Sequence, residues 1–569
     1  MPIASDNQRS LDVPLNMAYV HIRTFMMVWL PHFPNSLSGA DAQGRRMTSD
    51  KTSAVDTRVL DLFIIGGGIN GTGIANDAAG RGLSIGLCEQ ADLASATSSA
   101  SSKLIHGGLR YLEHKEFRLV REALHEREVL LAKAPHIIWP LRFILPHRQH
   151  LRPAWMLRAG LFLYDHLSPR DTLPGSKSLK FDHASPLKPD IKRGFEYSDC
   201  WVDDARLVVL NALQAQEQGG EILVRTRCVS AIEKDGVWEI TLENTRTGEQ
   251  MVRRARALVN AAGPWVESFI KGSTQRKSRY GINMIKGSHI ITRRINGDDR
   301  AFILQNEDKR IVFVLPWQND YSLIGTTDQN YEGDPTHITI SDEETDYILN
   351  VVNAHFKEQL TRDDVVTSYS GVRPLCDDES DDPSAMTRDY TLALDDTGAP
   401  MLSVFGGKIT TFRRLAESAM EKVEPWFPSM GKPWTDKRPL PGGNIDSREA
   451  YTRKLLTRYP FLGELRAARF ASSYGTLCEK FLEGVTEEAE LGEDFGAGLT
   501  RAEVDYLIDH EWATQADDIL WRRTKMDMRL NESQRKRLQE YVTGRLDTAS
   551  PNDMNEPVGT PSPDHALTH

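Results

Sequence analysis

The chain has 569 residues, enough for two to four domains with a large buried core, and its composition of 40% hydrophobic and 26% charged residues is that of a globular protein. A formal net charge of −11 argues against a nucleic-acid partner, and no apolar run approaches the roughly 20 residues that a membrane-spanning helix needs. The five cysteines are widely spaced and form no CxxC pair, so we expect no disulfide framework, no metal site and a cytoplasmic location.

Residues 1–58 do not share the pattern of the rest of the chain. Their only apolar part, 15–30, is interrupted by His21 and Arg23, and the uncharged remainder is short for the core of a signal peptide. We therefore expect no cleaved signal. We expect this extension either to be disordered or to precede the true translation start near Met47.

The stretch 61–89 predicts a strand, a tight turn, a helix and a second strand. The apolar run 60–65 is followed directly by Gly66, Gly68 and Gly71 in GxGxxG spacing. In this arrangement the first glycine permits the turn, the second lets the backbone approach a pyrophosphate, and the third lets the helix lie close to the sheet. The pattern therefore predicts a dinucleotide-binding unit.

The helix after this turn is expected over Asn70–Arg81, with its N-terminus aimed at the phosphates. We expect Gly67, Ile69 and Asn70 to contact the cofactor together with the three glycines. Glu89 ends the second strand, where a carboxylate accepts hydrogen bonds from the ribose hydroxyls. Because Glu89 would repel a 2′-phosphate, the sequence argues against NADP.

The segment 97–111 is rich in hydroxyl groups and ends in His-Gly-Gly, Leu, Arg and Tyr. In FAD proteins of the glutathione-reductase-like type, a serine-rich segment here wraps the diphosphate and the flavin, so this segment resembles a flavin-binding one. The alternative is a polar surface loop. The cofactor contacts expected in this segment are Ser98, Ser99, Ser102, Lys103, Leu104, His106, Gly107 and Gly108.

Residues 139–170 combine five arginines and three histidines with many aromatic and apolar residues, but contain a single acid, Asp165. Pro153 is suited to the first turn of a helix. A basic, aromatic helix too short to span a bilayer is typical of a helix that lies in the membrane interface. The alternative is a buried helix with solvated arginines.

Three further regions follow in the chain. Residues 195–262 predict a polar loop, an amphipathic helix and a meander of strands that ends in small residues, Ala262 and Gly263, at which backbone can approach a cofactor. Residues 281–370 show alternating apolar runs typical of an antiparallel sheet. Residues 405–416 predict a strand end, two glycines and a helix start.

The last part of the chain is helix-rich and ends in a polar tail. Amphipathic patterns over 432–546 predict an all-α domain, in which we identify no chemistry. The tail 547–569 is rich in Pro, Ser, Asp and Asn and is expected to be disordered.

From about Asp61 to about Tyr541, the sequence resembles the FAD-dependent, quinone-linked glycerol-3-phosphate dehydrogenases of aerobic bacteria. The segments that carry the resemblance include GGGINGTGIANDAAGRG, SSASSKLIHGGLRYLE, RGFEYSDCWVDDARL, IKGSHI, GTTD, SGVRPLCDD and FGGKITTFRRLAE. The resemblance implies oxidation of glycerol 3-phosphate to dihydroxyacetone phosphate, with FAD as cofactor and a membrane quinone as acceptor. It also favours peripheral attachment of segment 139–170 to an anionic phospholipid surface of the inner membrane, and we expect a homodimer.

The resemblance implies an α/β fold with three parts. A glutathione-reductase-like FAD-binding Rossmann domain would comprise 59–280 and 371–430, an antiparallel-sheet substrate domain 281–370, and an all-α C-terminal domain 432–546. Further cofactor contacts are then expected at the backbone of Val229 and at the second helix start. The contacts expected at this second helix start are Gly407, Lys408, Ile409 and Thr410.

The resemblance also identifies candidate substrate-binding residues. Cationic or hydrogen-bonding side chains recur in the shared segments at Arg110, Tyr111, His289, Arg373, Arg388 and Lys408. We expect His289, Arg373 and Lys408 to be catalytic, with His289 as the general base because of its intrinsic pKa. The alternative is a hydroxyl that is polarised by an arginine and loses its proton to water.

Two other functions stay open on the sequence. The first is an FAD-dependent amine or amino-acid oxidase, which shares the cofactor architecture and would bind a carboxylate through arginine. The second is a non-catalytic flavin protein recruited to membranes by segment 139–170. We expect non-covalent FAD, since only His106 offers an evident attachment point.

Overall fold

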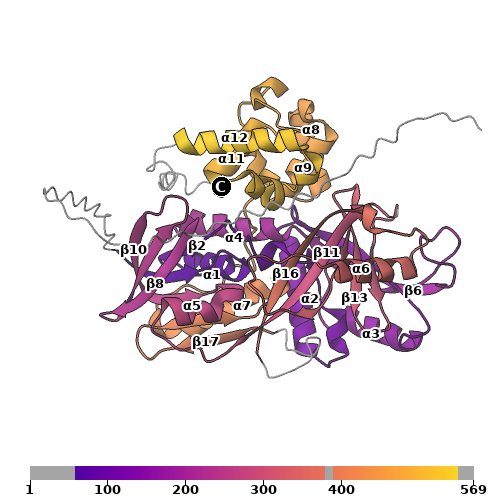
Figure 1. The fold of residues 1–569 in the computed structure, drawn as a ribbon, viewed down its shortest axis with the longest axis horizontal. Coiled ribbons are helices and arrows are strands. Elements are labelled where there is room, and N and C mark those ends of the chain that lie inside the picture. Colours follow the sequence, from indigo (N-terminus) through magenta and orange to yellow (C-terminus); the bar gives the residue numbers. More distant parts are fainter. Residues whose placement is uncertain (1–57, 296, 378–388, 549–569) are drawn as a thin grey trace, which may run out of the picture. The chain divides into compact units, whose positions relative to one another are not determined.

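The computed structural model describes residues 58–295, 297–377 and 389–548. The predictions for the N-terminal extension, for Arg388 and for nearly all of the C-terminal tail therefore lie outside the described residues. The described chain is an α/β protein with two mixed sheets and a helical C-terminal region (Figure 1).

The first sheet is built around the predicted dinucleotide-binding unit. Its central strands run parallel in the order β18, β10, β1, β2, β7, while β17 and the β8–β9 hairpin pair antiparallel at its margins. The strands are β1 (Val59–Ile65), β2 (Ile85–Glu89), β7 (Glu221–Val224), β8 (Thr226–Lys234), β9 (Val237–Asn244), β10 (Gln250–Asn260), β17 (Thr391–Asp395) and β18 (Met401–Phe405).

Side-chain alternation along these strands fills two separate cores. Leu62 and Ile64 of β1 pack with α1 (Ile69–Gly80), α4 (Asp204–Glu217) and α7 (Phe412–Val423). Phe63 and Ile65 point to the other face, where Trp238 of β9 and α5 (Val266–Ser273) cover the sheet. Both faces of β1 are therefore dry, which explains its uninterrupted apolar run.

The second sheet has ten strands and draws on two distant parts of the chain. The path runs β15, β11, β14, β13, β12, β4, β6, β3, with β16 added to β11 and β5 to β6, and all ladders are antiparallel except β12–β4. The strands are β3 (Leu104–Ile105), β4 (Ile138–Pro146), β5 (Lys177–Lys180), β6 (Arg193–Val202), β11 (Ile282–Arg293), β12 (Ala301–Gln305), β13 (Ile311–Trp317), β14 (Tyr321–Gly325), β15 (Gln329–Asn330) and β16 (Val365–Cys376).

Two predictions for this region are wrong. The sheet is not confined to 281–370, because β3, β4, β5 and β6 all belong to it. The predicted polar loop after Phe195 is strand β6, and the part of segment 139–170 that precedes the predicted helix contains strand β4. Both strands are buried on both faces over most of their length, so they lack the alternation that marks a half-exposed strand.

The second part of the interface segment is a helix, α3 (Ala154–His166), that begins directly after Pro153 as expected. Its inner side buries Leu161 and Tyr164, while its outer side exposes Trp155 (71%) and Phe162 (57%) to solvent. Within the described residues, no helix combines the length and apolar content needed to cross a bilayer.

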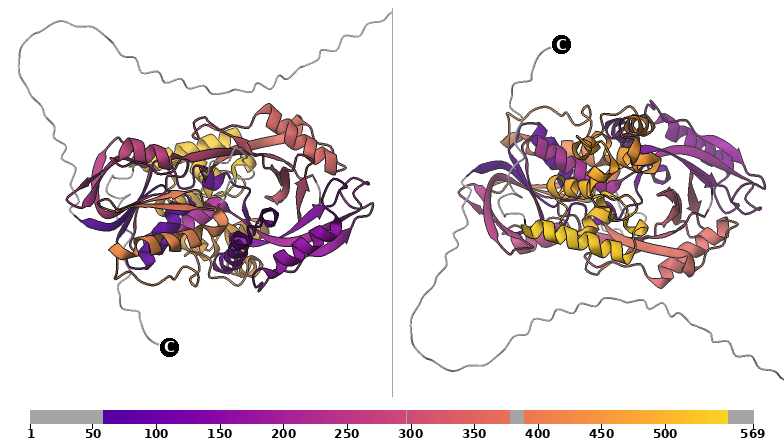
Figure 2. Two further views of the ribbon diagram at one scale, coloured as in Figure 1. Left: turned by 90° about the horizontal axis from the view of Figure 1, so that it is seen from below. Right: turned by 90° about the horizontal axis from the view of Figure 1, so that it is seen from above.

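The prediction of a helical C-terminal region is confirmed, and Figure 1 shows its helices grouped together. Seen from above they lie in front of both sheets, and from below they lie behind them (Figure 2). The helices are α8 (Arg448–Arg458), α9 (Gly463–Ser473), α10 (Glu479–Leu482), α11 (Arg501–Glu511), a π-helix η10 (Asp518–Arg523) and α12 (Glu532–Thr548). Helix α2 (Phe117–Lys133) and helix α6 (Asp342–His355) belong to the α/β part.

Candidate active site

The turn between β1 and α1 has the geometry that a dinucleotide diphosphate requires. Gly66 has a φ of +110°, and a Cβ there would lie 2.5 Å from the carbonyl oxygen of Ala261. A Cβ on Gly71 would lie 1.9 Å from the carbonyl oxygen of Gly66, so the first turn of α1 touches the loop directly. Only glycine fits either position, and Gly67 and Gly68 complete the turn between them.

The N-terminus of α1 faces a second predicted segment. The side-chain amide of Asn70 donates a hydrogen bond of 3.0 Å to the carbonyl of Gly406, beside Gly407. Among the described residues, the buried Oδ1 atom of Asn70 accepts no hydrogen bond, and the N-cap residue of α1, Gly68, has no side chain that could cap the helix. A helix that begins after a glycine, beside two glycine turns, lets a diphosphate approach its first turn closely.

Glu89 lies at the end of β2, as predicted, and accepts hydrogen bonds from two backbone amides. Its carboxylate oxygens are 2.7 Å from the nitrogen of Gly67 and 2.8 Å from that of Ala91. Burial raises the pKa of this carboxyl group above its ordinary value. Val229, predicted to meet adenine, lies where the β8–β9 ladder skips a residue and is 38% exposed. The bulge leaves its backbone outside that ladder.

The serine-rich segment starts with the 3-10 turn η1 (Thr97–Ser99) and links the two ends of the site. Ser98 Oγ accepts the N–H of Ile69 at 3.0 Å, which ties the segment to α1. Ser102 Oγ lies 2.9 Å from Nε2 of His289, so the same segment reaches the second sheet.

The side chains of Ser99 and Lys103 are occupied within the protein. The Lys103 ammonium is buried and donates to both carboxylate oxygens of Asp204, each at 2.9 Å, and to the carbonyl of Ser99 at 3.0 Å. Ser99 Oγ donates to the carbonyl of Ala96. Cofactor contacts at these two positions, and at the buried Leu104, are therefore expected from the backbone.

The His-Gly-Gly turn is held from two sides. The N–H of His106 donates to Thr410 Oγ1 at 3.3 Å, which joins this turn to the start of α7. The N–H of Gly107 donates to the phenol oxygen of Tyr164 at 2.9 Å, and Tyr164 donates to Asp199 at 2.7 Å. Gly108 follows with a φ of +71°. Tyr164 and Asp199 therefore position a turn that we predicted to face the flavin.

His289 is buried to 1% exposure on β11 and stacks on Tyr369, with ring centroids 4.9 Å apart. Burial, and then the nearby cations Arg373 and Lys103, lower its pKa well below the ordinary value. His289 is therefore a neutral imidazole at neutral pH. Its Nδ1 atom makes no hydrogen bond to any described residue.

Arg373 lies on β16, beside the β11 strand that carries His289. Its two terminal nitrogens bind Asp328 at 2.5 Å and the hydroxyl of Thr326 at 2.9 Å. The side chain stays 29% exposed, so the guanidinium group is fixed but not sealed off. Arg373 pairs in register with Ile285, four residues before His289 on β11.

Lys408 and Tyr111 form a second cluster of predicted residues. The Lys408 ammonium lies 4.0 Å from the centre of the Tyr111 ring, a cation–π contact. Arg110, the residue before Tyr111, is half-buried in the 3-10 turn η2 (Leu109–Leu112). Lys408 is the N-cap residue of the 3-10 turn η5 (Ile409–Thr411). Ala262 and Gly263 follow the end of β10, and a Cβ on Gly66 would lie 3.2 Å from the Cα of Ala262.

Several residues of the site were missed on the sequence. Asp328 and Thr326 stand in the GTTD segment, and Asp199 and Asp204 in the long segment that ends in DDARL, so the segments were noted without roles. No local signal pointed to Tyr164, whose phenol acts 57 residues from its partner Gly107.

Comparison with family models places this geometry in a known context. Residues 61–413 match the model described as FAD dependent oxidoreductase. Residues 433–543 match the model described as C-terminal domain of alpha-glycerophosphate oxidase.

The curated relatives align with this chain over nearly their full length. A glycerol-3-phosphate dehydrogenase of Pseudomonas aeruginosa is 60% identical over 86% of this chain and 96% of its own. An aerobic glycerol-3-phosphate dehydrogenase of Escherichia coli is 58% identical over 86% and 99%. A D-erythritol 1-phosphate dehydrogenase of Brucella abortus is 50% identical over 85% and 98%.

A solved structure supports the same relationship. The glycerol-3-phosphate dehydrogenase of Bacillus halodurans, crystallised with FAD, superposes with a TM-score of 0.65 at 26% identity. The superposition covers 89% of this chain and 97% of that one.

Proposed function

We propose that this chain oxidises sn-glycerol 3-phosphate to dihydroxyacetone phosphate. The reason is its family: the chain belongs to the FAD-dependent oxidoreductases and, within them, to the glycerol-3-phosphate dehydrogenases. FAD, when bound, accepts the hydride from the secondary carbon of the substrate, and a membrane quinone then receives the electrons. The observation that carries this proposal is a neutral, buried His289 beside the fixed guanidinium group of Arg373.

The cofactor would be held mainly by backbone groups. The Gly66–Gly71 turn and the N-terminus of α1 would bind the diphosphate, and Glu89 the ribose. The turns at His106–Gly108 and Gly407–Thr410, joined through Thr410, would hold the flavin end. This arrangement supports a glutathione-reductase-like cofactor domain over 59–280 and 371–430, although some of its strands lie in the second sheet.

His289 supplies a proton acceptor for the hydroxyl group of the substrate. Its neutral imidazole is hydrogen-bonded to Ser102 Oγ, so a proton can reach the ring directly or through that hydroxyl. The cations Arg373 and Lys103 that depress its pKa also favour return of the proton to solvent after turnover. His289 thereby acts as the general base, as the sequence suggested.

Arg373 supplies the main contact for the phosphate group. Asp328 and Thr326 hold one edge of its guanidinium group, which fixes the plane of the fork. Arg110, Lys408 and Tyr111 would complete the anion site from the opposite segments, with Arg388 as a further candidate outside the described residues. A planar fork in a fixed plane suits a phosphate better than a single ammonium.

Anaerobic reduction of the bound flavin tests the substrate. Glycerol 3-phosphate should bleach the flavin absorbance rapidly, while D-erythritol 1-phosphate and unphosphorylated glycerol should act slowly. The erythritol ester is included because a relative acting on that compound shares half of the aligned residues. Faster bleaching by D-erythritol 1-phosphate would overturn the substrate assignment, and no bleaching by any of the three would overturn the reaction.

Peripheral attachment to the inner face of the cytoplasmic membrane is supported by α3. Trp155, Met156, Phe162 and Leu163 form an exposed apolar stripe along its outer side. Burial of such a stripe in the headgroup region favours membrane binding. The neighbouring arginines support it less than expected, because Arg148 and Arg152 form ion pairs with Asp190 and Glu113.

Vesicle flotation tests this attachment. Trp155→Ser together with Phe162→Ser should release the protein from anionic vesicles, whereas Val366→Ser, an exposed apolar residue on β16, should not. Equal binding of both variants would move the membrane site away from α3. The homodimer stays a prediction.

A further inference from the structure

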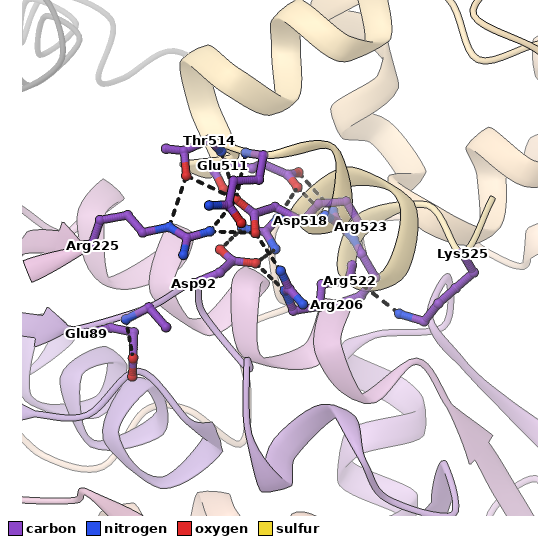
Figure 3. A network of polar contacts seen from close by, with 12 residues as sticks. Glu89, Asp92, Arg206, Arg225, Glu511, Thr514, Asp518, Arg522, Arg523 and Lys525 are labelled. Atoms are coloured by element: carbon purple, nitrogen blue, oxygen red, sulfur yellow. Dashed lines mark hydrogen bonds and ion pairs between the residues drawn. The ribbon is translucent and has the colours of Figure 1, made fainter. Parts of the chain in front are cut away.

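The C-terminal region sends two arginines from its π-helix into the cofactor part of the protein. Asp92, only 1% exposed, accepts two parallel hydrogen bonds of 2.8 Å from Arg523, which is fully buried (Figure 3). Arg522 binds the same carboxylate through Nε. Figure 3 shows these side chains converging on Asp92 close to Glu89.

Asp92 belongs to the turn that links the ribose site to the diphosphate site. It lies three residues after Glu89, and the N–H of Ala94 donates to the carbonyl of Gly67 at 3.1 Å. The N–H of Ser95 donates to the backbone carbonyl of Asp92. A shift of Asp92 would therefore move the turn that holds Gly67 in place.

A third cation of the C-terminal region lies near the other end of the same segment, which it reaches through two neighbouring carboxylates. Lys525, 5% exposed, donates to Asp203 at 2.9 Å, and the next residue, Asp204, binds Lys103. Lys103 directly follows Ser102, the partner of His289. The C-terminal region thus contacts one end of the segment 92–103 directly, at Asp92, and reaches the other end through Asp203 and Asp204.

The chemistry of these contacts favours positioning over simple adhesion. Apolar packing between α4 and the C-terminal helices would hold the domain in place without specifying where one carboxylate lies. A buried ion pair with bidentate geometry tolerates little displacement, because each partner left alone is an unpaired buried charge.

We propose that the C-terminal domain is part of the cofactor-binding machinery, with Arg523 and Lys525 as positioning residues that hold segment 92–103 in the conformation that binds FAD. This inference rests on the proposed function only in requiring that the protein binds FAD. It assigns a role in the cofactor site to a region in which the sequence showed no chemistry.

The test compares two buried arginines of the same domain interface in the full-length holoenzyme. Arg523→Met removes the bidentate contact to Asp92 but leaves Arg522 on that carboxylate. Arg206→Met is the matched control, because Arg206 is fully buried and binds Glu511 and the carbonyl of Ser473 without touching segment 92–103. The release of FAD after dilution is followed by flavin fluorescence, and the melting temperature by circular dichroism.

Both variants should melt at lower temperature, but only Arg523→Met should release FAD faster, by on the order of tenfold. Arg523→Lys should restore part of the difference, because one of the two hydrogen bonds can form. If Arg523→Met and Arg206→Met release FAD equally fast, the arginine is merely structural and the inference is wrong.

A second variant keeps the test decisive if Arg523→Met does not fold. Asp92→Asn preserves the shape of the side chain and removes its charge, and Arg523 keeps its 2.7 Å contact to the carbonyl of Glu511. Faster FAD release in Asp92→Asn supports the inference, and unchanged release contradicts it. Unmodified protein that holds no FAD would instead contradict the proposed function.

Discussion

The proposed cofactor end and the proposed substrate end of the site are built in different ways. The cofactor end uses backbone amides, glycine turns and hydroxyls, mostly from the continuous stretch 66–103. The proposed substrate end uses side chains, namely the neutral His289 of β11, the charged Arg373 of β16, and those of the turns around Lys408 and Tyr111. The cofactor end therefore depends on the backbone geometry that a few glycines allow, whereas the substrate end depends on particular ion pairs between distant segments.

The largest expected effect comes from a substitution at the cofactor end that blocks the close contact between the first turn of α1 and the Gly66 turn. Gly71→Ala would place a methyl group 1.9 Å from the carbonyl oxygen of Gly66, and this oxygen belongs to backbone, which cannot move away as a flexible side chain could. We expect a loss of FAD binding of at least about 4 kcal/mol, combined with a lower melting temperature. Flavin content after purification and gel filtration measures it.

The control for this prediction is Gly544→Ala in α12, where an added Cβ meets no atom within 4 Å. That variant should keep its FAD and gain slightly in stability, because alanine is the better helix former. Full flavin content in Gly71→Ala would show that the turn can relax, and the distinction between the two ends would weaken.

The next largest effect concerns the phosphate group. Arg373→Ala should weaken the binding of glycerol 3-phosphate by about 2–5 kcal/mol, since a phosphate would lose a charge-assisted pair of hydrogen bonds. The KM for glycerol 3-phosphate should rise steeply, while the slow reaction with unphosphorylated glycerol should hardly change. Arg362→Ala, which removes an exposed ion pair with Asp346, should change neither. An equal loss with both substrates would make Arg373 a structural or catalytic residue.

The cofactor end could be predicted from the sequence because its signals are local. The expected helix Asn70–Arg81 differs from α1 by one residue at each end, and Glu89 ends its strand as expected. Glycine spacing and apolar periodicity depend on neighbours within one turn of chain, so they are visible without the fold. The same holds for the C-terminal helices.

The substrate end and the domain contacts depend on partners far away in the chain. Arg373 finds Asp328 across 45 residues, and Arg523 finds Asp92 across 431. No spacing rule connects such pairs, so Arg373 was named only through a family resemblance, and Asp328, Asp92 and Arg523 were not named at all. Strands β4 and β6 were missed for a related reason, because burial on both faces removes the alternation that identifies a strand.

The pH dependence of stability sharpens the electrostatic side of the comparison. The folded pKa of His289 lies well below its unfolded value of about 6.5, so below that pH the unfolded chain binds a proton that the folded protein does not. The free energy of unfolding should therefore fall as the pH drops from about 6.5, by at most about 1.4 kcal/mol per unit for this group.

The His289→Gln variant should lose less of its free energy of unfolding between pH 6.5 and 5 than the unmodified protein, by up to about 2 kcal/mol, measured by urea unfolding. The slope should not vanish, because burial also lowers the pKa of His136 to about 3 and that of His355 to about 4. The exposed His337→Gln variant serves as control and should keep the full slope. An unchanged slope in His289→Gln would mean that this ring is charged in the folded protein.

The smallest expected effect lies where the two ends meet, at the His-Gly-Gly turn. Its backbone amide at Gly107 is held by a side chain, Tyr164, which also forms the inner face of α3. Tyr164→Phe keeps the ring packing and removes the hydrogen bonds that the phenol accepts from Gly107 and donates to Asp199, and Asp199 at 3.3 Å can take over the amide. The loss should be about 1 kcal/mol of stability, with a small acceleration of FAD release.

Tyr541→Phe removes a comparable phenol–carboxylate bond to Asp505 in the C-terminal helices and should lower the melting temperature without changing FAD release. If Tyr164→Phe loses FAD as severely as Gly71→Ala, then side chains, and not backbone geometry alone, determine the cofactor end as well.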